Sequence, residues 1–479
     1  MSDKLKILFV APEIAPYVKT GGLADVVSSL PKALKAKGHD VRSVMPEYAQ
    51  IEDKYLKKTE HLMHFETKVG WRQEYTGINY LNQDIPTYFV DNKYLFSRPS
   101  LYENGDRHLQ FAFFCRSVLK MLKKIDFKPD IIHTHDWQTA PLSLMLDDNY
   151  EDKFYADIDT VFTIHNLAYQ GKFEEKILYD VLDVDEEYWY YGDIRHDGLI
   201  NYMKSGIMTA DKITTVSKTY ADEIKYPYFG EGLDYALRMR NDDLTGIVNG
   251  INYREFNPAT DNRIYKKYDK NNIEKKFENK LRLQKEFDLK SDKESPLMGV
   301  ISRLVSQKGF ELLLHIFDEL MQEKVQFILL GTGQSEYEDR FLEMGRRYPE
   351  KTSINIKYDA ELAQKIYAGS DMFLMPSRYE PCGLSQLIAL RYGTIPVVRE
   401  TGGLKDTVAR VNEDGSRGFG FSFSNFNAHE LLFEIKRGLK MFKNKDIWEN
   451  IIFKAMSQDY SWQKSADKYL NLYYDLKEK

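Results

Sequence analysis

The chain has 479 residues, a length that exceeds one ordinary hydrophobic core and indicates two domains. Hydrophobic residues make up 43% and charged residues 29%, as in a globular protein, and the formal net charge is −6. Because charges of both signs are scattered along the chain, nucleic acid and an anionic membrane are disfavoured as main partners.

The two cysteines, Cys115 and Cys382, are far apart in sequence and exclude a disulfide framework, which fits a reducing cytoplasm. The first apolar segment, Ile7 to Ala11, is too short for a signal peptide or a membrane span. No later segment approaches about twenty consecutive apolar residues. We therefore expect a cytoplasmic protein.

Short apolar and β-branched runs alternate with amphipathic helical patterns through nearly the whole chain, which predicts the α/β class. The predicted strands of the first half are Lys6–Val10, Val41–Met45, Ile131–His133, Thr160–His165, Lys212–Val216 and Gly246–Val248. Those of the second half are Leu297–Ile301, Val325–Leu330, Asp371–Met375 and Ile395–Val398. Two such blocks predict two Rossmann-like domains.

The expected domain boundary lies near Asn249 and Gly250. We expect a first domain over 1–248, a linker over 249–264, a second domain over 265–460 and a terminal helix over 461–479. A charged helical region is predicted from Tyr265 to Lys290. The apolar stripe of the terminal helix either covers the first domain on a return crossing or caps the second, and the pattern alone leaves both open.

A pair of glycines, Gly21 and Gly22, lies between the first strand and a helical pattern, directly after Lys19 and Thr20. Such a turn lets backbone N–H groups approach a ligand, and the helix dipole and Lys19 add positive charge, so the segment suits a phosphate. A similar segment recurs at Thr401–Val408, with Thr, Gly, Gly, Leu, Asp and Val in the same places. The alternative for a single Gly-Gly pair is an ordinary turn.

Two clusters follow strands in the second half. Arg303 and Lys308 come after the strand that ends at Ile301, where open α/β sheets bind ligands, and could neutralise a diphosphate. Glu380 comes after the strand that ends at Met375, and could bind sugar hydroxyls or offset positive charge at an anomeric carbon. The alternatives are two solvated cations and a helix-capping carboxylate.

Histidines mark two strand ends of the first half. His133 and His135 are followed by Asp136 and Trp137, and His165 is followed by Asn166. Hydroxyl-binding polar groups beside an indole ring suit a carbohydrate. The His-x-His spacing also allows zinc, but no Cys pair supports it.

Together, six segments make the sequence similar to bacterial glycogen synthases and plant starch synthases. They are Lys19–Val26, His135–Gln138, Thr163–Asn166, Gly246–Ile251, Ser302–Leu304 and Glu380–Leu384. The resemblance runs in order along essentially the whole chain. It implies the GT-B architecture, in which two Rossmann-like domains face a central cleft, and a retaining, metal-independent transfer of glucose from ADP-glucose to the non-reducing end of an α-1,4-glucan. ADP-glucose and glycogen are then the partners, with no cofactor.

The resemblance also implies residue roles. Glu380, His165, Arg303 and Lys308 are expected to be catalytic. The expected donor-binding residues are Lys19, Gly21, Gly22, Asp25, Arg303, Lys308, Tyr358, Glu380, Cys382, Gly383, Leu384 and Ser385, with the base stacking on Tyr358. The acceptor side is expected to comprise Asp136, Trp137, His165 and Asn166.

The resemblance favours front-face substitution, in which the departing phosphate takes the acceptor proton, because double displacement needs a carboxylate on the far sugar face. Two alternatives stay open: a sucrose or trehalose synthase type of retaining glucosyltransferase on the same architecture, and a non-catalytic glucan-binding protein. The sequence leaves a homo-oligomer open.

Overall fold

A computed structural model describes residues 4–102, 105–149 and 151–478. The chain divides into two compact units. One contains the residues up to Val216, Ala221–Ile247 and the residues from Trp462 onward, and the other contains Ser217–Tyr220 and Val248–Ser461. The two units are called here the amino-terminal unit and the carboxyl-terminal unit.

The amino-terminal unit is built on a nine-stranded sheet. In spatial order its strands are β12 (Leu244–Gly246), β11 (Lys212–Thr215), β7 (Asp159–Ile164), β6 (Ile131–His135), β1 (Lys6–Val10), β2 (Asp40–Pro46), β5 (Thr87–Asp91), β4 (Arg72–Leu81) and β3 (Glu60–Val69). The strands from β12 to β5 pair in parallel, whereas β4 runs antiparallel to both neighbours. A second sheet of three short strands contains β8 (Lys172–Phe173), β10 (Leu199–Asn201) and β9 (Arg195–His196).

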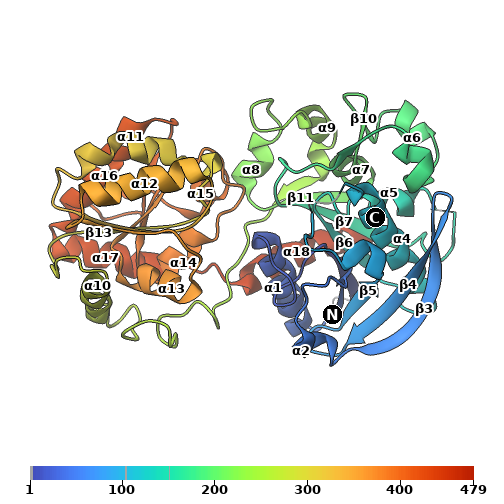
Figure 1. Cartoon of the computed structure of the whole chain (residues 1–479), viewed down its shortest axis with the longest axis horizontal. Helices are drawn as coiled ribbons and strands as arrows, with labels where there is room; N and C mark the ends of the chain where they lie inside the picture. Colours follow the sequence, from blue (N-terminus) through green and yellow to red (C-terminus); the bar gives the residue numbers. More distant parts are fainter. Residues whose placement is uncertain (1–3, 103–104, 150, 479) are drawn as a thin grey trace. The chain divides into compact units, whose positions relative to one another are not determined.

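Helices cover the larger sheet of this unit. The helix α1 (Gly22–Ala36) packs against α18 (Trp462–Lys477), as Figure 1 shows. A second group packs together from α4 (Arg107–Lys124) through α5 (Pro141–Asp147) to α7 (Tyr202–Thr209). The shorter helices of the unit are α2 (Asp53–Leu56), α3 (Lys93–Phe96), η1 (Leu178–Leu182), α6 (Glu187–Tyr190), α9 (Asp234–Met239) and η2 (Asn241–Asp243). Another short helix, α8, spans Lys218–Glu223.

The apolar stripe of α18 lies inside the amino-terminal unit. Tyr469 and Tyr473 are fully buried there, and the hydroxyl of Tyr473 is 2.7 Å from His133 Nδ1 on β6. Lys37, which follows α1, forms an ion pair with Asp467 of α18 at 2.5 Å. Of the two arrangements that the sequence left open for this helix, the structure has the one in which it packs on the first unit.

The carboxyl-terminal unit contains a six-stranded parallel sheet. Its order is β15 (Thr352–Asn355), β14 (Gln326–Leu330), β13 (Leu297–Ile301), β16 (Met372–Met375), β17 (Ile395–Arg399) and β18 (Phe421–Phe423). Its helices are α10 (Glu274–Glu286), η3 (Ser306–Lys308), α11 (Phe310–Leu320), α12 (Ser335–Arg347), α13 (Ala360–Gly369), α14 (Ser385–Arg391), α15 (Gly402–Thr407), α16 (Ala428–Phe442) and α17 (Lys445–Met456). Helices lie on both faces of this sheet: α11, α12 and α16 on one, α10, α13 and α14 on the other (Figure 1).

Local sequence explains where several of these helices start. Asp359, Asn427 and Asn444 precede α13, α16 and α17, and each accepts a hydrogen bond from a main-chain N–H of the first turn. These side chains satisfy amide groups that have no partner inside the helix. The core between helices and sheet is formed by apolar strand residues such as Met298, Phe327 and Phe373, all fully buried.

The predicted α/β class is confirmed, since parallel strands alternate with helices in both units. Three expectations differ in detail. The strand predicted at 246–248 lies at 244–246, and the helix predicted from Tyr265 begins only at Glu274. The segment 249–264, expected as a linker, packs into the carboxyl-terminal unit, where Ile251 and Ile264 join the core.

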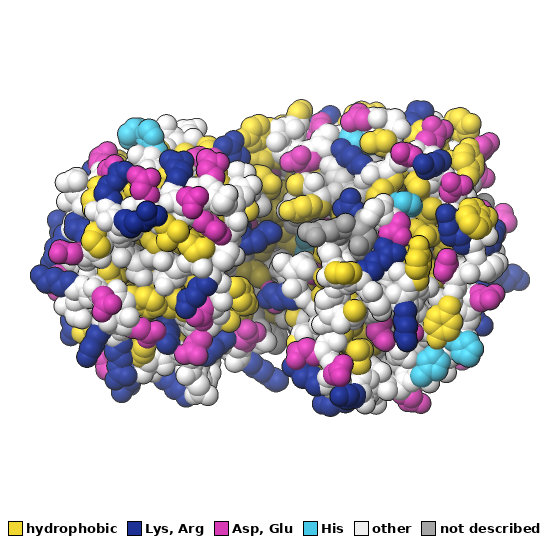
Figure 2. Space-filling view, viewed as in Figure 1, with side chains coloured by type: hydrophobic (Ala, Val, Ile, Leu, Met, Phe, Trp, Pro, Cys, Tyr) yellow, Lys and Arg dark blue, Asp and Glu magenta, His cyan; other side chains and the backbone are white. Residues whose placement is uncertain are grey.

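In the part of the chain that the structure describes, no helix is both long enough and apolar enough to cross a membrane. On the face drawn in Figure 2, basic and acidic side chains are interspersed over each unit. On that face, therefore, neither unit carries a patch of one charge sign among its described residues.

Candidate functional site

The carboxyl end of β13 leads into a cationic turn. Arg303 is exposed after the strand, and Lys308 ends the short helix η3 with its side chain only 17% exposed. Gly309 follows with a left-handed φ of 68°, and a Cβ there would lie 2.0 Å from the carbonyl oxygen of Pro376. This close approach requires glycine, and it fixes the turn that carries Lys308 against the end of β16.

Lys308 forms an ion pair with Glu380 across that approach. The Lys308 ammonium lies 2.6 Å from Glu380 Oε2, and the hydroxyl of Ser377 donates to the same oxygen at 3.1 Å. Glu380 is 6% exposed. The structure thus brings together the two clusters that the sequence placed 72 residues apart. The partly buried pair is screened less by solvent than a surface pair.

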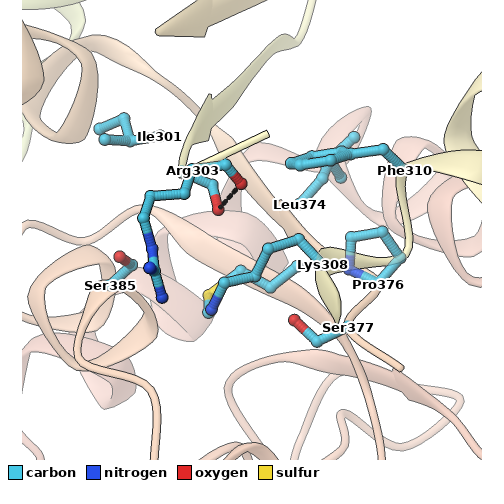
Figure 3. Close-up of a pocket in the computed structure, with 10 residues that line it drawn as sticks. Ile301, Arg303, Lys308, Phe310, Leu374, Pro376, Ser377 and Ser385 are labelled. Carbon is cyan, nitrogen blue, oxygen red and sulfur yellow. Dashed lines mark hydrogen bonds between the residues drawn. The ribbon is translucent and has the colours of Figure 1, made fainter. Parts of the chain in front are cut away.

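Figure 3 shows the pocket that these turns enclose. The guanidinium of Arg303 and the ammonium of Lys308 extend in the same direction, with Ser385 and Ser377 on either side. The pocket has a volume of about 160 Å³, and Leu374 and Phe310 lie at its apolar end. Two cations beside hydroxyl groups form a binding environment for an anion such as a phosphate.

The loop from Glu380 to Ser385 is packed against the second Gly-Gly pair. A Cβ on Gly402, whose φ is 43°, would lie 2.1 Å from the Glu380 carbonyl oxygen, and one on Gly403 would lie 2.1 Å from that of Cys382. These glycines therefore serve close backbone packing that holds the Glu380 loop. The repeated sequence does not form a second open turn.

Other residues of this loop have structural partners. Burial raises the pKa of the Cys382 thiol to about 12, so this thiol is not a reactive nucleophile. Gly383 has a φ of 71°, and Gln386 donates to its carbonyl oxygen at 3.0 Å. Leu384 is the N-cap of α14 and Ser385 its first residue. Of these residues, Ser385 lines the pocket.

Tyr358 lies in the turn between β15 and α13 and is 88% exposed. The next helix starts immediately after Asp359, which fixes the end of this turn. A large ring with both faces in solvent is available for stacking.

In the amino-terminal unit, the first Gly-Gly pair differs from the second. Gly21 is in an extended conformation, and among the described residues a Cβ there would meet only Glu13 Oε1, at 4.0 Å. Gly22 begins α1. The buried carboxylate of Glu13 accepts hydrogen bonds from both the N–H and the hydroxyl of Thr20 at 2.7 Å. The turn is therefore open to a ligand, and its hydrogen bonds to Glu13 fix its position.

Lys19 precedes this turn with its side chain 51% exposed, and its ammonium lies 2.7 Å from the Asp25 carboxylate on α1. Exposed pairs of this kind are weak, so Lys19 can exchange Asp25 for another anion at little cost.

Asp136 connects the ends of β6 and β7. It has a left-handed φ of 57°, and its carboxylate accepts from the main-chain N–H of His165 at 2.7 Å and of Asn166 at 3.4 Å. Burial raises the pKa of Asp136 to about 7. The amide oxygen of Asn166 accepts from the N–H of Ala168, which fixes the turn after β7. Asp136, His165 and Asn166 therefore form one polar corner.

Trp137 is placed differently from the expectation. Its side chain is 5% exposed and packs against Phe111, Phe173 and Tyr202. A Cβ on Gly171 would lie 2.3 Å from its ring. Protein atoms thus cover the indole, and its position is that of a core side chain beneath the polar corner, with no open face for stacking on a sugar.

Three histidine rings meet at this corner, where His135 hydrogen-bonds His165 and stacks on His133. His135 Nδ1 lies 3.0 Å from His165 Nε2, while the two ring nitrogens of His133 bond Tyr473 at 2.7 Å and Thr163 at 2.6 Å. Since both nitrogens of His133 are engaged, the His-x-His pair has no zinc geometry. Among residues 4–102, 105–149 and 151–478, no group of three or more His, Cys, Asp or Glu side chains could hold a metal ion.

Sequence reasoning missed two supporting residues, Glu13 and Ser377. Each lies within seven residues of a predicted site residue and hydrogen-bonds to it or to its neighbour. Each is a polar side chain two or three residues after the end of a strand, β1 or β16. This pattern is too common to identify a site residue without the fold.

Comparison with known proteins covers both units. A family model described as starch synthase catalytic domain matches residues 6–239, and one described as glycosyl transferases group 1 matches 282–450. The chain is 48% identical to a glycogen synthase of Clostridium novyi over 472 residues, 98% of each chain. It is 49% identical to one of Clostridium botulinum, covering 98% of this chain and 99% of the relative.

A solved structure is similar over the full length. The catalytic domain of starch synthase IV from Arabidopsis thaliana, bound to ADP and acarbose, matches with a TM-score of 0.91 at 32% identity, covering 100% of both chains.

Proposed function

The chain belongs to the glycogen and starch synthase family of glycosyltransferases, which has the GT-B architecture. We propose that Arg303, Lys308 and Glu380 are central to its transfer of glucose from ADP-glucose to an α-1,4-glucan. The observation that carries the assignment is the ion pair of Lys308 with Glu380, beside Arg303, in one pocket of the carboxyl-terminal unit.

Arg303 and Lys308 bind the diphosphate of the donor and stabilise the negative charge that develops as ADP leaves. Two fixed cations can do this without a divalent metal, because donors aimed at developing charge act strongly in a partly desolvated pocket. Lys19, beside the Gly21–Gly22 turn, is also assigned to donor binding, with phosphate replacing Asp25 as its partner. Backbone groups of Cys382, Gly383, Leu384 and Ser385 contact the donor, and the adenine stacks on Tyr358.

Glu380 contacts the transferred glucose. Its Oε2 is already engaged by Lys308 and Ser377, which lowers its nucleophilicity and favours a role in hydroxyl binding and charge compensation. This supports front-face substitution with retention, in which the C1–O bond to phosphate breaks first. The acceptor oxygen then attacks C1 and the leaving phosphate takes its proton.

Asp136, His165 and Asn166 serve the sugar and acceptor side from the amino-terminal unit. Burial lowers the pKa of His165 to about 3, so its ring is neutral at pH 7 and hydrogen-bonds sugar oxygens without adding charge. Trp137 supports this corner from beneath. The non-reducing end of glycogen is the proposed acceptor.

A coupled assay of nucleotide release tests the function. ADP should be released from ADP-glucose in the presence of glycogen, with no loss on adding EDTA, and much more slowly from UDP-glucose. Preference for fructose or another free sugar would point to a sucrose or trehalose synthase type. Binding of glycogen without any nucleotide release would point to a non-catalytic glucan-binding protein.

We also propose a cytoplasmic location, supported by two buried cysteines that are both free thiols. Whether copies of the chain associate is tested by light scattering over a range of concentrations, with a homo-oligomer giving a multiple of the 56.2 kDa chain mass.

A further inference from the structure

His135 is a fully buried histidine that the proposed reaction does not use. It is the last residue of β6, and its Nδ1 lies 3.0 Å from Nε2 of His165. Its own Nε2 is buried and has no hydrogen-bond partner among the residues that the structure describes. A buried polar atom without a partner has an energetic cost, so this arrangement needs a reason.

The ring of His135 cannot turn freely. It stacks on His133 with centroids 4.3 Å apart and an interplanar angle of 27°, and on Phe9 at 5.6 Å and 13°. Contacts with these two nearly parallel rings hold the imidazole plane in one orientation. Within this plane, the hydrogen bond to His165 selects the ring edge that carries Nδ1.

The backbone conformation at Asp136 allows two consecutive residues to hydrogen-bond His165. Successive side chains of a strand point to opposite faces, so residues 135 and 136 would normally diverge. The left-handed φ of 57° at Asp136 breaks that alternation. As a result His135 bonds the ring of His165 while Asp136 bonds its main-chain N–H at 2.7 Å.

The protonation pattern follows from counting hydrogens. Burial lowers the pKa of both His135 and His165, so each ring is neutral and carries one N–H. If His165 Nε2 carried the hydrogen of the shared bond, His135 would keep a buried N–H without an acceptor, and such orphaned N–H groups are rare. If His135 Nδ1 carries it, only a lone pair is left without a partner, and His165 must carry its hydrogen on Nδ1.

We propose that His135 is a positioning residue that fixes His165 as the Nδ1–H tautomer. His165 then presents a hydrogen-bond donor to an oxygen of the substrate and has no free lone pair to act as a general base. This deepens the proposed function, on which the role of His165 rests, and it leaves the acceptor proton to the departing phosphate.

The test reads the tautomer directly in the unmodified protein. In full-length chain labelled with ¹⁵N-histidine, two-bond ¹⁵N–¹H correlation spectra distinguish the two tautomers, and a His165→Gln sample assigns the signal. We expect protonated Nδ1 and unprotonated Nε2 at His165 near pH 7. The Nε2–H tautomer at His165 would overturn the inference, and folded His165→Gln is needed only to assign the signal.

Variants of His135 test the mechanism of the effect. His135→Asn keeps an N–H donor near the position of Nδ1 and should preserve the tautomer, whereas His135→Leu removes the donor and should mix the two tautomers. Tyr473→Phe is the matched control, since it removes a hydrogen bond of the same buried cluster, at His133, and should leave the His165 signals unchanged. A pure Nδ1–H signal in folded His135→Leu would contradict the assignment to His135.

Kinetics separate this inference from the proposed function. We expect His135→Leu to lower kcat at saturating ADP-glucose about tenfold or more, with His135→Asn recovering most of it. If the tautomer changes as expected while kcat does not, His135 positions His165 but His165 has no part in the transfer. The proposed role of His165 would then fail and the positioning role would stand.

Discussion

At the level of single residues, the ion pair of Lys308 with Glu380 is the feature on which turnover should depend most. Removing one preorganised donor at developing charge typically costs about 10² to 10³ in rate. We expect Lys308→Ala or Glu380→Ala to lower turnover at least about a hundredfold while the chain stays folded. ADP release at saturating donor and glycogen measures the effect.

The control for that pair is Lys324→Ala. Lys324 also pairs with a carboxylate, that of Asp292 at 3.0 Å, but it is 66% exposed and lies outside the pocket. Its loss should leave turnover unchanged. Near-normal turnover of Lys308→Ala would remove Lys308 from the reaction.

The carboxyl group of Asp136 should make stability depend on pH. Its pKa is about 7 in the folded chain, against roughly 4 for an unfolded aspartate. The folded state therefore binds more protons between these values, and its contribution to stability, full below about pH 4, is lost as pH rises through about 7. We expect Asp136→Asn to flatten the fall in unfolding free energy over that window, as measured by urea unfolding at a series of pH values. An unchanged pH profile would show that Asp136 is already ionised at low pH.

At the level of elements, the two Gly-Gly turns predict opposite responses to one substitution. Gly402→Ala introduces a Cβ 2.1 Å from the Glu380 carbonyl oxygen at a positive φ, which should cost more than about 1–2 kcal/mol of stability. Gly21→Ala meets nothing closer than 4.0 Å and should change stability by less than about 1 kcal/mol. Thermal unfolding of both variants measures the difference. Equal losses would mean that the two turns pack alike.

The same pair shows what the sequence could predict. The repeat at Thr20–Leu23 and Thr401–Leu404 correctly indicated two turns that each start a helix, α1 and α15. It could not tell an open turn from one filled by a neighbouring loop, because the loop at Glu380 approaches from elsewhere in the sequence. Similarly, the aromatic character of Trp137 suggested a sugar platform, and only packing shows the ring to be covered.

Burial explains part of the difference between the strands that the sequence predicts and those that it does not, although the buried strands β5 and β18 are also not predicted. The buried parallel strands, such as β1 and β13, have short apolar runs that are easily recognised. The hairpin of β3 and β4 has one face in solvent, so polar residues interrupt both strands and the apolar run never forms. The charged pattern predicts a helix already in the segment before α10, but charged residues fit loops equally well, and the helix begins at Glu274.

At the level of the whole molecule, α18 belongs to the amino-terminal unit although it follows the carboxyl-terminal unit in the chain. Deleting residues from Trp462 onward would expose the face of α1 that packs on α18, and it would remove the hydrogen bond between His133 of β6 and Tyr473. We expect the amino-terminal unit to unfold at lower temperature and the carboxyl-terminal unit to be little affected. Hydrogen exchange resolved by peptide, during a thermal scan, assigns the loss to a unit.

A chain ending at Lys477 is the control for this deletion, since it keeps all of α18. It should unfold like the full chain. Equal destabilisation of both units on deleting α18 would contradict the division of the chain into separately packed units.

The position of α18 in the chain also sets an order of events during synthesis. A ribosome that has completed β12 at Gly246 has made the whole nine-stranded sheet of the amino-terminal unit, but it must still translate residues 247–461 before it reaches α18. Domains generally fold as they are made, amino-terminal first, at about 5–20 residues per second. Here the amino-terminal unit lacks α18 until the end of translation, so the face of α1 that α18 covers stays exposed until then. The carboxyl-terminal unit, by contrast, has all of its strands once Phe423 is made, before α18 is translated.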